Sequence, residues 1–108
     1  MERACFIIEI KPGMEGEYER RHEAVWPDLL AVLSDSGVRN YTLFRRGTMV
    51  VAYCECHPSV AESFSRIGGA EVNSRWSEWF EDVIERLTDS DGNLLWAAEV
   101  WHQDLSPQ

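Results

Sequence analysis

Hydrophobic and polar positions alternate with different spacings along the chain, and each spacing predicts an element. Residues 4–10 are rich in β-forming side chains and are followed by Pro12-Gly13, which predicts a strand. From residue 15 to about residue 35, apolar side chains return every three or four positions, the period of one helix face, until Gly37 ends the pattern. Because a proline removes a helical hydrogen bond, we expect a kink or two helical pieces near Trp26-Pro27.

The remaining elements are predicted by the same kinds of signal. In chain order they are a strand at 38–46, a turn at Gly47, a strand at 48–56, a short helix from Pro58 to about Ile67, a longer helix at 71–87, a loop at 89–93 and a strand at 94–102. The last residues, ending in Ser106-Pro107-Gln108, are expected to be frayed.

The predicted order, β-α-β-β-α-α-β, is that of an α+β protein with the split βαβ, or ferredoxin-like, arrangement. Such a fold has a four-stranded antiparallel sheet with its helices on one face and its first and third strands in the middle. Those two strands are apolar at nearly every position, whereas the second and fourth carry polar residues such as Arg39, Asn40 and Glu99, as edge strands often do.

The other face of such a sheet would be left without a cover. Either Cys5 and Ile7 or Phe6 and Ile8 must point toward it, because neighbouring side chains of a strand point to opposite faces. A large exposed apolar face usually marks an interface. The pattern therefore predicts a two-fold homodimer that packs sheet against sheet, as a dimeric α+β barrel.

Length and charge narrow the possible partners. The 108 residues suit one domain, spanning 1–108, and the ten Lys and Arg against nineteen Asp and Glu give a net charge of -9. Such an acidic surface repels phosphate backbones and anionic lipids, so neither nucleic acid nor a membrane is an expected partner. The N-terminal apolar run is short and interrupted by Glu9, unlike a signal peptide, and an odd set of three cysteines indicates reduced thiols in the cytoplasm.

Tyr18 and His22 are the most informative pair of polar residues. They lie four positions apart in the predicted first helix, on its apolar face, so both side chains turn toward the sheet. A histidine oriented by a neighbouring phenol is suited to shuttle protons near neutral pH. The alternative is a core histidine bonded to a carbonyl, beside a tyrosine whose hydroxyl reaches outward to water.

The aromatic and sulfur-containing residues offer fewer functional signals. Among five tryptophans, Trp76 is the best candidate for a wall against a flat ligand such as a sugar ring, and most of the others suit a small core. Cys54 and Cys56 share one strand face, but a closed zinc site needs four ligands and no second pair exists, so we expect buried thiols. His57 and His102 are expected at the surface.

Several motifs of cofactor chemistry are missing from the sequence. It contains no glycine-rich phosphate loop and none of the patterns HExxH, GxSxG or CxxC. An enzyme with this sequence would work with its side chains alone, without a metal or another cofactor, which favours proton transfer on a small neutral molecule.

The stretch 18–29, Tyr-Glu-Arg-Arg-His-Glu-Ala-Val-Trp-Pro-Asp-Leu, resembles the signature of the L-rhamnose mutarotase family. Residues 37–41 (Gly-Val-Arg-Asn-Tyr) and the pair Arg75-Trp76 match that family as well, and the likeness extends over the whole chain. The resemblance implies a cytoplasmic ferredoxin-like homodimer that interconverts the α and β anomers of L-rhamnose without a cofactor.

Position by position, the resemblance makes His22 the proton donor and places Tyr18, Tyr41 and Trp76 on the sugar. Family members often carry a second tryptophan directly after the first, where this chain has Ser77, so the resemblance places Ser77 at the sugar as well. A related sugar such as L-fucose therefore stays open as the substrate. Two other functions also stay open, a small-molecule oxygenase and a binding module, because this fold hosts many activities.

Overall fold

A computed structural model describes residues 1–103 of the chain, so the expectation for Ser106–Gln108 lies outside the described residues. Its elements are β1 (Glu2–Ile10), α1 (Glu15–His22), α2 (Pro27–Asp35), β2 (Val38–Arg46), β3 (Met49–Cys56), α3 (Val60–Gly68), α4 (Glu71–Trp79), β4 (Ile84–Arg86) and β5 (Leu95–Trp96). Among residues 1–103, no helix combines the length and the apolar composition needed to span a bilayer.

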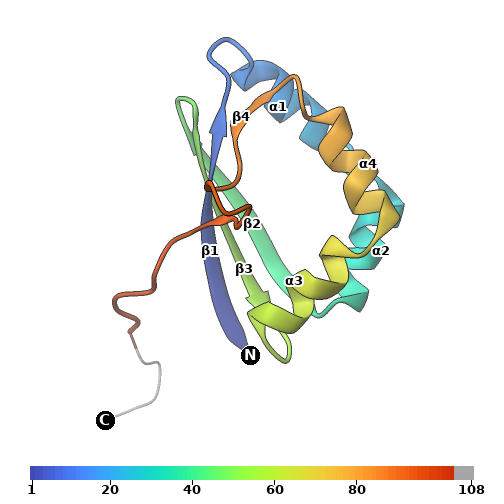
Figure 1. Cartoon of the computed structure of the whole chain (residues 1–108), viewed down its shortest axis with the longest axis vertical. Helices are drawn as coiled ribbons and strands as arrows, with labels where there is room; N and C mark the ends of the chain where they lie inside the picture. Colours follow the sequence, from blue (N-terminus) through green and yellow to red (C-terminus); the bar gives the residue numbers. More distant parts are fainter. Residues whose placement is uncertain (104–108) are drawn as a thin grey trace.

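The strands form one antiparallel sheet in the order β2-β3-β1-β4, with β5 also paired to β1. β1 and β3 therefore lie in the middle, as their apolar composition predicts. Figure 1 shows the four helices on one side of this sheet and the C-terminal segment on the other. The α+β class and the helix-covered face are thus confirmed.

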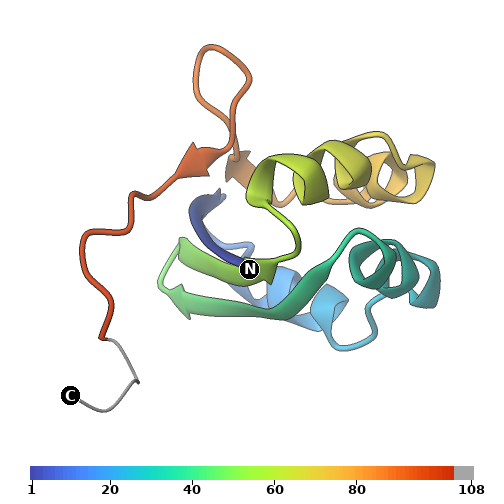
Figure 2. The same cartoon turned by 90° about the horizontal axis from the view of Figure 1, so that it is seen from below.

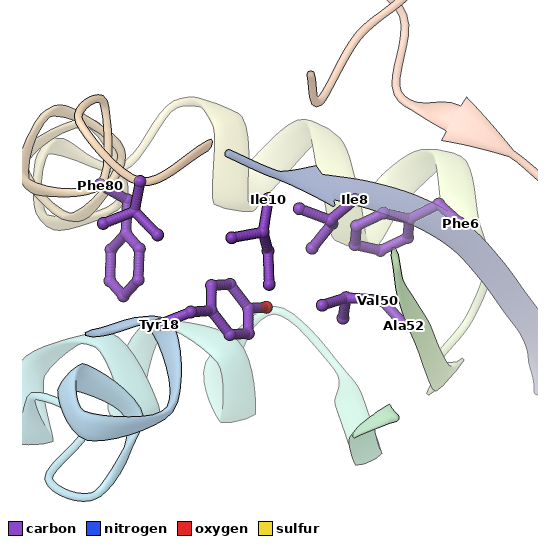
Figure 3. Packing of buried hydrophobic residues seen from close by; sticks show 8 residues of the cluster. Phe6, Ile8, Ile10, Tyr18, Val50, Ala52 and Phe80 are labelled. Atoms are coloured by element: carbon purple, nitrogen blue, oxygen red, sulfur yellow. The ribbon is translucent and has the colours of Figure 1, made fainter. Parts of the chain in front are cut away.

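Alternation along β1 determines which side chains face the helices. Phe6, Ile8 and Ile10 are buried toward the helices, whereas Cys5 and Ile7 on the opposite face are only half-buried. Figure 3 shows how the buried residues of β1 meet those of β3 and α1 in one core. Of the two alternatives for the open face, the structure selects Cys5 and Ile7.

The predicted break in the first helical stretch is confirmed. α1 ends at His22 and α2 begins at Pro27, whose missing N–H group costs nothing at the first position of a helix. In Figure 2 the two helices follow one another along the same layer. Residues 23–26 between them turn the chain so that Trp26 lies directly before α2.

The longer helix expected at 71–87 is wrong in its second half, because α4 ends at Trp79. The Phe80 N–H bonds to the carbonyls of Trp76 and Ser77, which tightens the last turn, and the Val83 carbonyl then accepts from the Lys11 N–H at 2.8 Å. Pairing with β1 continues through β4. A tight turn can bury apolar residues three positions apart as a helix does, so the periodicity alone did not reveal the stop.

The strand expected at 94–102 is also wrong in extent, because only Leu95–Trp96 forms β5. The bond from the Ala97 N–H to the Cys5 carbonyl, at 2.8 Å, continues the contact with β1 by one residue. Beyond it residues 98–103 form no strand, and Val100 is 93% exposed. β4 and β5 share the outer edge of β1, and the described sheet has five strands instead of four.

Candidate active site

Tyr18 and His22 lie on one face of α1 and belong to a cluster of aromatic side chains. The other members come from α4, from Phe80 directly after it, and from Trp26 directly before α2. Their ring centroids are 4.5 Å apart, and the His22 ring lies 5.1 Å from Phe80 and 5.5 Å from Trp76. The Trp76 and Phe80 rings are themselves 4.9 Å apart. We call this set the aromatic cluster, and its members are Tyr18, His22, Trp26, Trp76, Trp79 and Phe80.

One ring nitrogen of His22 has a fixed partner within α1. Nδ1 lies 2.7 Å from the Tyr18 carbonyl oxygen. Because a carbonyl only accepts hydrogen bonds, Nδ1 carries the proton and Nε2 is the nitrogen left to exchange one. The bond to a carbonyl agrees with the alternative of a core histidine. The imidazole is only half-buried, however, which does not agree with a position in the core.

Tyr18 reaches inward instead of outward. The residue is 5% exposed, and Figure 3 shows its ring extending from α1 toward the sheet, with the hydroxyl directed toward Ile10 and Val50. Burial raises the pKa of this phenol well above its ordinary value, so it stays protonated at neutral pH. In this neutral form the phenol of Tyr18 can donate a hydrogen bond.

Tyr41 faces the same interior from the edge strand β2. Its ring makes an edge contact with Phe6 at 6.4 Å, which places the side chain on the helix side of the sheet. Because β2 is an edge strand of the described sheet, 38% of the residue stays exposed. Burial, followed by the neighbouring Cys54 and Tyr18, raises the pKa of its phenol well above the usual range, so this phenol too stays protonated at neutral pH.

Trp76 and Ser77 are neighbours in α4 with different surroundings. Trp76 is half-buried inside the aromatic cluster, while Ser77 is exposed. Successive residues of a helix point about 100° apart, which explains the difference. The structure thus brings Tyr18, His22 and Trp76 together, places Tyr41 against Phe6 on the same side of the sheet, and leaves the Ser77 side chain outside the cluster.

Arg21 is a residue whose role sequence reasoning missed. It is 9% exposed, and its guanidinium makes two 3.0 Å hydrogen bonds to Asp82, a 2.7 Å bond to Glu17 and a bond to the Trp79 carbonyl. The same group lies 5.1 Å from the Trp79 ring centroid. Arg21 therefore ties the end of α1, beside His22, to the end of α4.

Sequence signals for this arrangement were incomplete. The four-residue spacing of Glu17 and Arg21 indicates a helical ion pair, but Asp82 is 61 positions away from Arg21 and could not be linked to it. Phe80 was not among the candidate site residues. The structure places its ring against both Tyr18 and His22.

The sulfur-containing residues and the remaining histidines lie where the sequence predicts. Cys54 and Cys56 are fully buried, with their sulfur atoms 3.7 Å apart, and His57 and His102 are exposed. Within the described part of the chain no group of three or more His, Cys, Asp or Glu side chains is arranged to hold a metal ion.

Two open cavities lie along β1, away from the aromatic cluster. One, of about 390 Å³, is lined by residues that include Arg3, Cys5 and Trp96, and the other, of about 620 Å³, by residues that include Ile7 and Arg86. Neither is lined by Tyr18, His22, Tyr41 or Trp76. They do not belong to the candidate site.

The architecture is similar to that of two solved structures. An L-rhamnose mutarotase from Formosa agariphila superposes with a TM-score of 0.79 at 21% identity, over 96% of this chain and 100% of that one. The tetracenomycin F2 cyclase of Streptomyces glaucescens superposes with a TM-score of 0.65 at 16% identity, over 97% and 98% of the two chains. Both likenesses show a shared fold.

Sequence comparisons distinguish between those two activities. The chain is 33% identical over 105 residues to the L-rhamnose mutarotase of Phocaeicola vulgatus, covering 96% of this chain and 100% of the relative. It is 31% identical over 104 residues to the L-rhamnose mutarotase of Bacteroides thetaiotaomicron, with the same coverage. A family model described as L-rhamnose mutarotase matches residues 3–103. The resemblance noted in the sequence is thereby confirmed: the chain belongs to the L-rhamnose mutarotase family and is an isomerase.

Proposed function

We propose that this chain interconverts the α and β anomers of L-rhamnose with His22 as general acid and base, and with Tyr18, Tyr41, Trp76 and, at the rim, Ser77 around the sugar. The observation that carries this assignment is the bond from Nδ1 of His22 to the Tyr18 carbonyl. It orients the ring and leaves Nε2 for proton exchange, within an aromatic cluster whose Trp76 offers a flat apolar face to a pyranose.

The reaction needs one proton to move in each direction. In the imidazolium form, with a proton on both ring nitrogens, Nε2–H donates its proton to the ring oxygen as the bond between that oxygen and C1 breaks, and the C1 hydroxyl loses its proton to water. The open-chain aldehyde rotates about its C1–C2 bond. Nε2 then takes the proton back from the C5 hydroxyl as this oxygen adds to the other face of the carbonyl, and water returns a proton to the new hydroxyl at C1.

The protonation state of the two phenols supports a role for them as hydrogen-bond donors to the sugar. Burial raises the pKa of both Tyr18 and Tyr41 well above neutrality. Neither is a base at neutral pH, so we assign the removal of the C1 hydroxyl proton to water. The two phenols act as neutral donors that hold sugar oxygens in place.

The required rate enhancement is modest because mutarotation also proceeds in water. A positioned acid or base contributes about 10²–10⁴-fold, which corresponds to roughly 3–5 kcal/mol of barrier. One imidazole and a few orienting groups supply enough stabilisation for this reaction.

The test is anomer exchange measured by NMR saturation transfer with L-rhamnose. His22→Asn keeps a side-chain donor for the Tyr18 carbonyl but removes the exchangeable proton, so exchange is expected to fall by about 10²–10⁴-fold. His102→Asn, at an exposed histidine, is the matched control and should exchange as fast as the wild type. Full activity of the His22 variant would overturn the assignment, and faster exchange of L-fucose would change the proposed sugar.

A homodimer through the open face of the sheet is part of the proposal. Phe44 is 62% exposed and Met49 is 43% exposed, and β pairing aligns Phe44 with the half-buried Val51 and Ile7 on that face. A continuous apolar stripe across three strands fits the same stripe on a second copy of the chain.

Light scattering tests this homodimer. The wild type should have twice the monomer mass, and Phe44→Glu should have the mass of one monomer. A wild-type monomer in dilute solution would refute the dimer.

The cellular location is the last part of the proposal. Cys5, Cys54 and Cys56 are free thiols, and the latter two are buried at contact distance without a bond between them. Reduced thiols are typical of the cytoplasm, where we place the protein.

A further inference from the structure

β2 contains one residue more than its partner strand at the point where Tyr41 is presented. Arg39 pairs with Glu55 and Thr42 pairs with Tyr53, so Asn40 and Tyr41 together lie opposite the single residue Cys54. Two residues opposite one define a β-bulge, a feature that redirects side chains and is common beside active sites.

The extra residue allows Val38 and Tyr41 to point to the same face of the sheet. Val38 is 5% exposed and packs with Cys54 and Cys56 in the core under the helices. Tyr41, three positions later, faces the same side. Because a regular strand alternates its side chains, residues three positions apart point to opposite faces. Without the bulge, either Val38 would leave the core or Tyr41 would leave the site.

Asn40 has the backbone conformation that makes the bulge possible. Its φ is +52°, and among residues 1–103 it is the one non-glycine residue with a positive φ. Asparagine tolerates this left-handed conformation better than most residues, and β-branched residues hardly adopt it.

A chain of hydrogen bonds on the open face holds Asn40 in place. Its Nδ2 donates to Oε1 of Glu55 at 3.0 Å, and the Tyr53 hydroxyl donates to Oε2 of the same carboxylate at 2.8 Å. The Thr42 hydroxyl donates to the Asn40 carbonyl at 3.0 Å. The bonds from Asn40 and Tyr53 lower the pKa of Glu55, which keeps it an ionised acceptor.

We propose that Asn40 is a positioning residue whose left-handed backbone and bond to Glu55 turn the Tyr41 hydroxyl toward the sugar. The inference rests on the proposed function for the role of Tyr41, but the orientation of Tyr41 can be measured without any sugar. On this proposal, the open face of the sheet contributes to the site on the helix side, because the hydrogen bonds that hold the bulge lie on the open face.

The test compares Asn40→Val, which disfavours the left-handed conformation, with Asn40→Gly, which allows it and lacks only the side-chain bond. A spectrophotometric titration of the tyrosines reports the orientation, because an exposed phenol titrates near pH 10. In the wild type the pKa values of Tyr18, Tyr41 and Tyr53 are all raised. Asn40→Val should add one phenol that titrates near pH 10, and Tyr41→Phe in the same background should remove it.

Activity provides the second readout. In Asn40→Val, KM for L-rhamnose should rise about tenfold, the loss of one hydrogen bond, while kcat changes less than about threefold because His22 is not displaced. Asn40→Gly should raise KM by less than about threefold. Arg46→Val, at an exposed residue further along β2, is the matched control and should match the wild type in both readouts.

Each outcome has a distinct consequence. If Asn40→Val releases no phenol, the positioning role is wrong. If a phenol is released but KM is unchanged, Asn40 does position Tyr41 and the proposed contact of Tyr41 with the sugar is wrong. If circular dichroism shows that Asn40→Val does not fold, the milder Asn40→Ala undergoes the same two measurements with the same criteria.

Discussion

The two faces of the sheet use similar residues for different purposes. On the helix side, Tyr18 and Tyr41 have phenols whose pKa values are raised by burial, and their rings contact other aromatic rings. On the open side, Tyr53 donates to the carboxylate of Glu55, and the apolar residue Phe44 is largely exposed. A tyrosine on the helix side thus packs among aromatic rings, whereas Tyr53 on the open side bonds to a carboxylate.

This difference indicates where the fold can accept change. The core residues of the helix side, Tyr18 among them, are buried between the sheet and the helices. Open-side residues are held by single hydrogen bonds and ion pairs that face water, which contribute little to stability in an isolated subunit. The predictions below test that contrast, first where the two sides should differ most.

The largest expected difference is between two phenylalanines. Phe80 is 4% exposed, and Phe80→Ala should lower the free energy of unfolding by about 3–5 kcal/mol because it leaves a cavity beside Tyr18 and His22. Phe44→Ala on the open face should cost less than about 1 kcal/mol in dilute protein. Urea unfolding at one fixed protein concentration measures both. Equal losses in a monomeric sample would show that the open face is packed in the isolated subunit.

Ion pairs should show the same contrast on a smaller scale. Arg21→Met keeps the apolar stem but removes the guanidinium that joins Asp82, Glu17 and the Trp79 carbonyl. We expect a loss of about 1–2 kcal/mol, since Arg21 itself is nearly buried although its acidic partners reach water. Arg3→Met breaks the exposed pair with Glu99 and should leave the urea midpoint unchanged. An equal shift of the urea midpoint in the two variants would show that the buried and the exposed arginine contribute equally to stability.

Acidification should weaken the α1 ion pairs in a defined range. The bonds from Arg20 and Arg21 lower the pKa of Glu17 from 4.5 to about 2. Because the folded-state pKa is the lower one, the stability from this group is present above pH 4.5 and is lost as the pH falls toward 2. The urea midpoint of the wild type should therefore fall over this range, and Glu17→Gln should fall less steeply. Identical pH profiles would show that Glu17 does not contribute.

Much of the fold could be predicted because its signals are local. The β-forming side chains of residues 4–10, the proline at position 27 and the four-residue spacing of Tyr18 and His22 are each local signals, and each specifies the structure of its own short segment. The helix stop at Trp79 could not be predicted, because it depends on the pairing of Ile84 with Ile10 across the sheet. Local periodicity carries no information about such distant partners.

The candidate site divides in the same way. Tyr18 and His22 were found together because one helix face holds both, whereas the inward direction of Tyr41 depends on the bulge at Asn40. The strand at 38–46 was predicted from the sequence, but one extra residue in a strand shows only when its partner strand is aligned beside it. The register between strands that are distant in the sequence is therefore the feature that could not be predicted.

The smallest expected effect extends the contrast between inward and outward positions to α4. Trp76 lies in the aromatic cluster and Ser77 is exposed one position later, although the resemblance to the family placed both on the sugar. Trp76→Ala should raise KM for L-rhamnose more than tenfold, because a stacking face is lost. Ser77→Ala should raise KM less than about threefold, since its side chain reaches the sugar only from the rim. Saturation-transfer measurements over a range of L-rhamnose concentrations give both values, and a larger effect at Ser77 than at Trp76 would mean that the sugar binds against the outer face of α4.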